Sequence, residues 1–129
     1  MFKIADMRSM KERPMEYYPT TDNETISLGE ALVLDSGSLK KCGITATPEF
    51  IAMKAVTDIE TIPVVRVNED VVLETTFAAD GSSIVEGDKV TIHTDGLQVT
   101  ATTGSGVFYI TKKLGTGDIS TKVLGMFRR

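Results

Sequence analysis

The 129-residue sequence has no tryptophan, one cysteine (Cys42) and one histidine (His93). A single cysteine excludes an internal disulfide and any cysteine-rich zinc or iron–sulfur site. A metal centre built from histidine and cysteine would need more such ligands than this chain has. The sequence has no Gly-x-Ser-x-Gly segment, and His93 would be the one histidine that could serve as the base of a serine hydrolase triad. We therefore expect no metal, no cofactor and no enzymatic activity.

Long apolar runs are also missing. The longest uncharged ones, such as residues 31–34, have four members, whereas a membrane-spanning helix needs about 20. Residues 1–13 carry charge throughout, unlike a secretory signal. The 18 acidic residues outnumber the 14 basic ones and give a net charge of −4, which disfavours a surface that neutralises phosphate backbones. We expect neither a membrane nor a nucleic acid as partner.

Threonine and valine, in contrast, are abundant, with 17 and 12 copies. Both favour β-strands, and clusters of glycine, aspartate, asparagine and serine recur between the apolar segments as turn signals. The fold class that we predict is all-β, a small antiparallel barrel or sandwich. The expected strands are residues 26–34, 39–42, 49–53, 62–67, 71–77, 89–94, 97–102, 107–114 and 119–127.

The dipeptide Asp95-Gly96 predicts a two-residue hairpin turn. In the resulting register Ile92 lies opposite Val99 on an apolar face, and His93 lies opposite Gln98 on a polar face. We therefore expect His93 to face solvent.

Residues 1–18 differ in composition from the rest of the chain, because they hold four of the six methionines and two of the three tyrosines. Ile4, Met7 and Met10 recur at helical spacing. We interpret 1–18 as an extended or short-helical N-terminal arm on a β domain of residues 19–129. A flap over the domain's own core, or a frayed terminus, is the alternative. The candidate partner-contact residues of the arm are Phe2, Ile4, Met7, Met10, Met15, Tyr17 and Tyr18.

The remaining chemically suggestive motifs have simpler structural interpretations. Cys42 follows two lysines, but a nucleophile would need a partner base, so we expect a structural thiol. Glu69, Asp70 and Glu74 lack the spacing of a calcium loop and are interpreted as solvated charges. The glycine-rich segments lack the following helix of a phosphate-binding loop. Aromatic residues near the basic pairs are too few to indicate binding of single-stranded nucleic acid by base stacking.

Four segments carry a family resemblance. They are LGEALVLDSGSLKKC (28–42), PEFIAM (48–53), VEGDKV (85–90) and TDGL (94–97). Together they resemble the small head decoration, or capsid cement, proteins of tailed bacteriophages, in which a strand entering at Gly-Glu-Ala is followed by a turn and a second strand at Pro-Glu-Phe-Ile-Ala. The resemblance covers residues 26–127 and leaves the arm outside it.

The resemblance implies a non-enzymatic virion protein, made in the host cytoplasm, that binds the capsid exterior. Its partner would be the major capsid protein, whose subunits it would bridge, and copies could form a homo-oligomer on the lattice. The acidic turns around Asp70, Asp80 and Asp95 would then face solvent. Two alternatives stay open. An exposed groove with aromatic and basic residues would favour a barrel that binds nucleic acid or oligosaccharide. Two acids from distant turns that converge in a pocket would favour a carboxylate-dependent enzyme.

Overall fold

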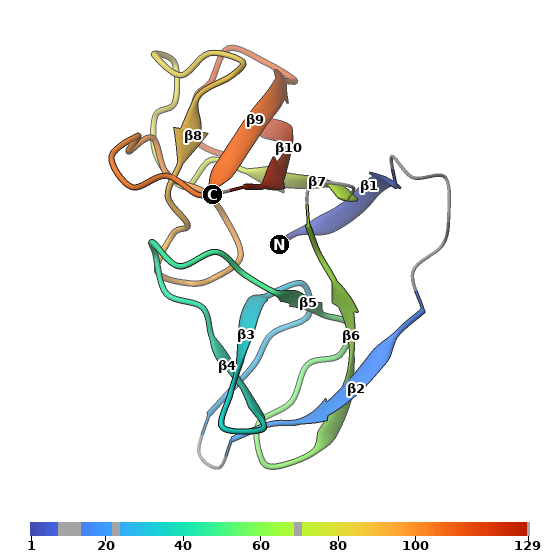
Figure 1. Cartoon of the computed structure of the whole chain (residues 1–129). Helices are drawn as coiled ribbons and strands as arrows, with labels where there is room; N and C mark the ends of the chain where they lie inside the picture. The colour runs from blue at the N-terminus through green and yellow to red at the C-terminus, as the bar shows by residue number, and fades with distance from the viewer. Residues whose placement is uncertain (8–13, 22–23, 69–70, 129) are drawn as a thin grey trace.

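The computed structural model describes residues 1–7, 14–21, 24–68 and 71–128, which form ten β-strands in two antiparallel five-stranded sheets (Figure 1). The described residues contain no helix, and hence none that could cross a membrane. The predicted all-β class is confirmed. Of the two predicted architectures the sandwich fits, because neither sheet closes into a barrel.

Sheet A is the upper group of strands in Figure 1. Its spatial order is β1 (Lys3–Met7), β7 (Val71–Thr76), β10 (Lys122–Phe127), β9 (Phe108–Lys113) and β8 (Lys89–Val90). Sheet B is the lower group. Its order is β2 (Glu16–Pro19), β6 (Thr61–Arg66), β5 (Phe50–Ala52), β3 (Ala31–Asp35) and β4 (Ser38–Lys41).

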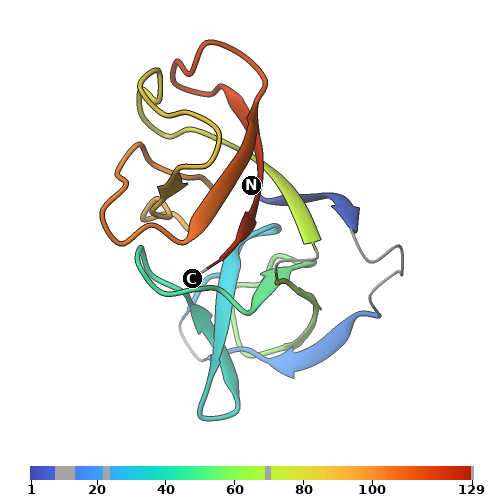
Figure 2. The same ribbon diagram turned by 45° about the horizontal axis from the view of Figure 1, so that its top comes forward.

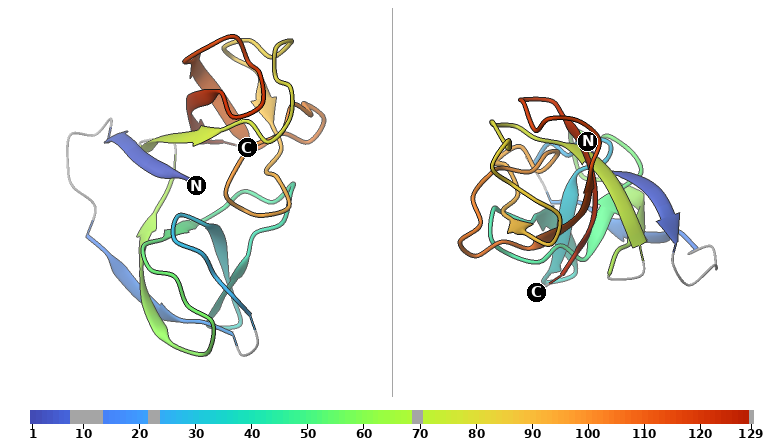
Figure 3. Two further views of the ribbon diagram at one scale, coloured as in Figure 1. Left: turned by 180° about the vertical axis from the view of Figure 1, so that it is seen from behind. Right: turned by 90° about the horizontal axis from the view of Figure 1, so that it is seen from above.

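The N-terminal segment belongs to both sheets. β6 and β7 follow each other in the chain but lie in different sheets. β1 pairs with β7, with Ile4 opposite Leu73, and β2 pairs with β6, with Tyr17 opposite Pro63. Figures 2 and 3 show β1 beside β7 and β2 beside β6 from other sides. Residues 3–7 and 16–18 are therefore in strands of the two sheets rather than in a detached arm.

Two apolar clusters fill the interior. The larger lies between the sheets and includes Leu73, Phe108 and Phe127, and the smaller is held within sheet B. β5 contributes to both, because Ile51 packs in the larger cluster while Phe50 and Ala52 pack in the smaller one. Successive side chains of a strand point to opposite faces, so a strand with three buried residues must be covered on both sides. Sheet B is therefore apolar on both faces at its centre.

The predicted strand 26–34 is interrupted. Gly29 has a φ of +80°, which turns the chain ahead of β3. Ile26 instead forms an isolated antiparallel bridge with Val56, with backbone bonds of 2.9 Å in both directions. The strand signal of residues 26–34 thus covers a bridge, a turn and a strand.

The Asp95-Gly96 hairpin has the predicted register at its base. Ile92 and Val99 form an antiparallel bridge, and the His93 backbone N–H donates to the Gln98 carbonyl at 2.8 Å. The long strands expected on either side are wrong, however. β8 has two residues. Beyond the Ile92–Val99 bridge, the Thr100 N–H donates to the Thr91 carbonyl and the Thr91 N–H donates to the Thr102 carbonyl, both at 3.0 Å, while the Val99 N–H donates to Thr76 of β7.

The polar face of this hairpin is also less exposed than predicted. His93 is half-buried and Thr91 is buried. The Thr91 hydroxyl lies 2.7 Å from the Thr100 hydroxyl, so the buried group keeps a hydrogen-bond partner.

Candidate functional site

Phe2, the first of the predicted contact residues, is part of the core. Its side chain is only 2% exposed, and its ring centroid lies 5.0 Å from that of Phe127 and 5.7 Å from that of Phe108. Its backbone N–H donates to the Gly29 carbonyl at 3.1 Å. Ile4 is half-buried against the same cluster. The burial of Phe2 leaves its side chain unable to contact a partner, which corrects that expectation. Ile4 is only partly buried, and its contact with a partner stays a prediction.

The helical spacing of Ile4, Met7 and Met10 does not produce a helix over residues 3–7, which form β1. The Met7 backbone pairs with Val71, and the register shifts between Ile4 and Asp6. Met10 lies outside the described residues. The pattern that matters here is the two-residue alternation of an extended chain, because Phe2 and Ile4 both pack against the core.

The second half of the segment is fixed to sheet B by a charged contact. The Glu16 carboxylate accepts hydrogen bonds from Arg66 Nε (2.9 Å) and Nη2 (3.0 Å), and from the Tyr18 hydroxyl (2.8 Å). The hydrogen bond to Glu16 is the main cause that raises the pKa of Tyr18 and also that of Arg66. No sequence signal links Glu16 to Arg66, which lies 50 positions away. This two-pronged ion pair was missed by sequence reasoning.

Phe50 lies under the same contact. The Arg66 guanidinium carbon lies 4.7 Å from the centroid of the Phe50 ring, and the Tyr18 ring centroid lies 5.2 Å from it. Tyr18, another predicted contact residue, is half-buried in this packing. A planar guanidinium that both bridges a carboxylate and stacks on a ring holds β2 in one position.

Among the predicted contact residues whose side chains the structure describes, Met15 and Tyr17 are the most exposed. Their side chains are 49% and 63% exposed. Tyr17 alternates with Glu16 and Tyr18 along β2, and so points away from the Arg66 contact. Met15 lies immediately before β2. Pro63, opposite Tyr17 on β6, is half-buried. We call Met15, Tyr17 and Pro63 the β2 face.

Cys42 has the surroundings of a structural thiol. It is buried, its Sγ donates to the Ala46 carbonyl at 3.0 Å, and burial raises its pKa to about 12. The thiol is therefore protonated near neutral pH, which is the unreactive form. Among the described residues, no group of three or more histidine, cysteine, aspartate or glutamate side chains is arranged to hold a metal ion.

The acidic turns differ from one another. Asp80 is exposed, and the Ser82 backbone N–H is the main cause that lowers its pKa. Asp95 is half-buried, and its Oδ1 accepts hydrogen bonds from the backbone N–H groups of Leu97 and Gln98 at 2.8 and 3.2 Å. Asp70 lies outside the described residues. The expected solvent-facing role fits Asp80, whereas Asp95 holds its own turn.

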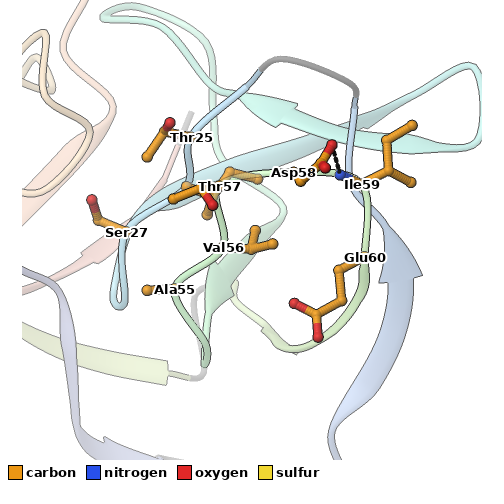
Figure 4. Close-up of a pocket in the computed structure, with 9 residues that line it drawn as sticks. Thr25, Ser27, Ala55, Val56, Thr57, Asp58, Ile59 and Glu60 are labelled. Atoms are coloured by element: carbon orange, nitrogen blue, oxygen red, sulfur yellow. Dashed lines mark hydrogen bonds between the residues drawn. The ribbon is translucent and has the colours of Figure 1, made fainter.

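A hollow of about 550 Å³ lies between residues 25–27 and 55–60 (Figure 4). Asp58 and Glu60 are its two acids, and both are already engaged. Asp58 Oδ1 accepts the backbone N–H of Ile59, and the Glu60 carboxylate pairs with Lys54. Hydroxyl groups of Thr25, Ser27 and Thr57 supply the other polar atoms. The hollow can bind polar groups but brings together no base and nucleophile of the kind that covalent catalysis uses.

Two further hollows lie beside β1. One of about 300 Å³ is mostly apolar and includes Phe2, Leu28 and Met53. The other, about 490 Å³, includes Asp6, Thr111, Tyr109 and Arg128. The Arg128 guanidinium carbon lies 4.9 Å from the centroid of the Tyr109 ring. The second hollow therefore combines an aromatic ring, a cation and a hydroxyl.

No protein-family model matches the sequence, and a search of curated proteins finds no match. The case for a function consequently rests on the residues and their geometry.

Proposed function

We propose that this protein is a structural virion component that binds the outer surface of an assembled phage capsid and stabilises it by bridging major capsid subunits. The observation that carries the proposal is the exposed β2 face, where Tyr17 projects from a strand held by the Glu16–Arg66 contact and Met15 lies immediately before that strand. The resemblance of residues 28–42, 48–53 and 85–90 to phage head decoration proteins supports the same function.

The β2 face suits a protein contact for physical reasons. Tyrosine supplies a large apolar ring with a polar end, and methionine adapts its shape to an irregular partner surface. Association costs free energy when loops and side chains must be ordered. Because β2 is already paired with β6 and fixed through Arg66, little of that cost remains at its backbone.

Stabilisation of a shell then follows by linkage. A ligand that binds the assembled lattice but not the free subunits lowers the free energy of the lattice by RT ln(1 + [L]/Kd). This amounts to about 2.7 kcal/mol per site at a hundredfold excess over Kd. Many copies on one capsid add these contributions.

The test uses undecorated heads mixed with the purified protein. Binding is followed by co-sedimentation, and stabilisation by the temperature of heat-induced genome release. We expect the wild-type protein to bind and to raise the release temperature. The double variant Met15→Ser/Tyr17→Ser should bind at least about tenfold more weakly, since it loses the central apolar contacts of the interface. Ile119→Ser is the matched control, because Ile119 is 65% exposed but lies between β9 and β10 of sheet A.

The possible results distinguish the capsid-binding function from the assignment of the β2 face as the contact surface. If saturating wild-type protein neither binds heads nor raises the release temperature, the capsid function is wrong. If the wild type binds and the double variant binds equally well, the function stands and the β2 face is not the contact. Urea unfolding of each variant shows whether a loss of binding reflects a loss of fold.

A second candidate is binding of an oligosaccharide or a nucleic acid. The hollow that contains Tyr109, Thr111 and Arg128 favours it, since aromatic rings stack on sugars and bases while arginine binds phosphate. Arg128 already covers the Tyr109 ring, so a ligand would have to displace it. Fluorescence titration with single-stranded DNA and with glycans tests this candidate in the variants Tyr109→Phe and Tyr109→Ala. If the candidate is right, binding is saturable, and only Tyr109→Ala loses it.

A further inference from the structure

Three segments of the chain meet at residues 29–31, directly ahead of and at the start of β3. The Phe2 backbone N–H donates to the Gly29 carbonyl at 3.1 Å. The Ala52 N–H of β5 donates to the Glu30 carbonyl at 3.0 Å. The Ala31 N–H donates to the carbonyl of Gly96, in the hairpin turn, at 2.9 Å. This junction joins sheet B to the N-terminus and to the hairpin.

A glutamate side chain is buried in the junction. Glu30 is 1% exposed, and its Oε1 accepts the Ser27 backbone N–H at 3.2 Å. Its Oε2 is buried and has no hydrogen-bond partner among the described residues. Burial of an ionised carboxylate costs much more free energy than burial of the neutral acid unless the charge is paired and hydrogen-bonded.

The hairpin turn packs directly on this side chain. A Cβ at Gly96 would lie 2.8 Å from Glu30 Cγ, and Gly96 has a φ of +71°. Only glycine allows the turn to come this close in that conformation. Any movement of the Glu30 carboxylate toward water must therefore displace the Asp95-Gly96 turn or the chain beside it.

The charges that act on Glu30 come from three neighbouring segments. Burial is the largest influence and raises its pKa above the ordinary value of 4.5. Lys41 of β4 lowers the pKa, while Glu24 and Asp95 raise it. Asp95 also attracts the Met1 amine. Two of the three charges that act on Glu30 directly are negative and therefore disfavour its ionised form.

We propose that Glu30 is a proton-controlled latch between sheet B and the Asp95-Gly96 turn. Neutral Glu30 keeps the turn closed on the start of β3, and ionised Glu30 loosens it. The closed junction favours the protonated acid, whereas an opened junction exposes the group to water. Closure is therefore strongest below pH 4.5, weakens as the pH rises through the higher pKa of the closed state, and is weakest above that pKa. The latch belongs to the free protein and does not depend on capsid binding.

Hydrogen exchange tests the latch. Amide protection of residues 29–33 and 95–99, corrected for intrinsic exchange, should increase as the pH is lowered from about 7.5 to about 5. Each unit by which the pKa of the closed state exceeds that of the open state changes the opening equilibrium by up to about tenfold. The Ile110 amide of β9 in sheet A, which donates to the Asp88 carbonyl just before β8, serves as an internal reference that should not follow this trend.

Two variants isolate the carboxylate. Glu30→Gln should abolish the pH dependence at the junction. Glu49→Gln is the matched control, because Glu49 Oε1 also accepts one backbone N–H at 3.2 Å, from Leu34, but the side chain is only half-buried. The control should retain the wild-type pH dependence.

Direct titration of the wild-type protein keeps the proposal falsifiable if Glu30→Gln fails to fold. The Glu30 side-chain carboxyl, observed by carbon-13 NMR, should titrate with a midpoint above 4.5. A midpoint at or below 4.5, or junction protection that does not change with pH in the wild type, overturns the latch. Equal pH dependence in the wild type and Glu30→Gln overturns it as well.

Discussion

Arg66 connects the N-terminal segment to the second apolar cluster, because its guanidinium binds Glu16 and stacks on Phe50. We predict that Arg66→Ala lowers the free energy of unfolding by about 1 kcal/mol, the upper range for an ion pair whose partners are partly exposed. Arg66→Lys should lose most of the same amount, since an ammonium group cannot form the two-pronged contact. Urea unfolding midpoints measure both effects.

The Lys40–Asp35 pair provides the control. Its single contact of 3.0 Å joins side chains that are 42% and 58% exposed. Lys40→Ala should therefore change the free energy of unfolding much less than Arg66→Ala does. If Arg66→Lys is as stable as the wild type, geometry at Glu16 does not matter and only the charge does.

Cys42 gives a second prediction at the scale of one residue. With a pKa of about 12, only about one thiol in ten thousand is ionised at pH 8. We expect alkylation of the native protein at pH 8 to be at least about a hundredfold slower than alkylation in urea, where the pKa returns to its ordinary value. Mass spectrometry of quenched samples measures the two rates, and Cys42→Ser gives the background. Similar rates in both conditions would show that the thiol is accessible and activated.

At the scale of a structural element, β1 is the least expected part of the molecule. Phe2 fills a position between Phe108 and Phe127 and is 2% exposed. We predict that Phe2→Ala lowers the free energy of unfolding by about 3–5 kcal/mol, as for other buried phenylalanines. Tyr17→Ala, on the exposed β2 face, should cost less than about 0.5 kcal/mol. Thermal unfolding followed by circular dichroism compares the two.

This prediction is the opposite of what a detached arm over residues 1–18 would imply, since such an arm could be removed with little loss of stability. Removal of β1 would uncover Leu73 and the ring of Phe127, both of which lie in the core. A Phe2→Ala variant with wild-type stability would restore the detached arm as the better description of the segment.

The comparison of elements also shows which structural signals are local. β6, β7 and β9 lie within the predicted segments or one residue beyond them, because alternation and turn residues act over a few positions. The segment 97–102 was predicted as a strand from the same signals, but Val99 pairs with Phe77 as well as with Ile92. Such pairing depends on a distant strand end, which no local pattern encodes.

The candidate site, like the strands, could be predicted from the sequence only in part. Exposed Met15 and Tyr17 belong to the segment that the unusual composition of residues 1–18 singled out. The burial of Phe2 and the contact between Glu16 and Arg66 were not predictable, because they arise when β1 and β2 pair with β7 and β6. The solitary buried carboxylate of Glu30 had no sequence signal either, since it depends on how the hairpin turn packs.

At the scale of the whole molecule, the two sheets are joined in ways that oppose independent movement. β5 supplies side chains to both apolar clusters, and the N-terminal segment pairs with both sheets. One end of the β2 edge also approaches β4, through an isolated bridge between Thr20 and Leu39. A load applied to the β2 face would therefore be transmitted to sheet B and, through β6 and β7, to sheet A.

The pairing of β1 with β7 also constrains the order in which the chain can fold as it is synthesised. β1 leaves the ribosome before the other nine strands, yet Ile4 has no partner until Leu73 has been made. β7 is itself completed on its other edge by β10, the last of the ten strands. Pairings between distant segments form slowly, and unpaired apolar strands are exposed to aggregation meanwhile. Sheet B, whose strands all lie before residue 67, can assemble early, whereas the hydrophobic first residues must wait for nearly the whole chain.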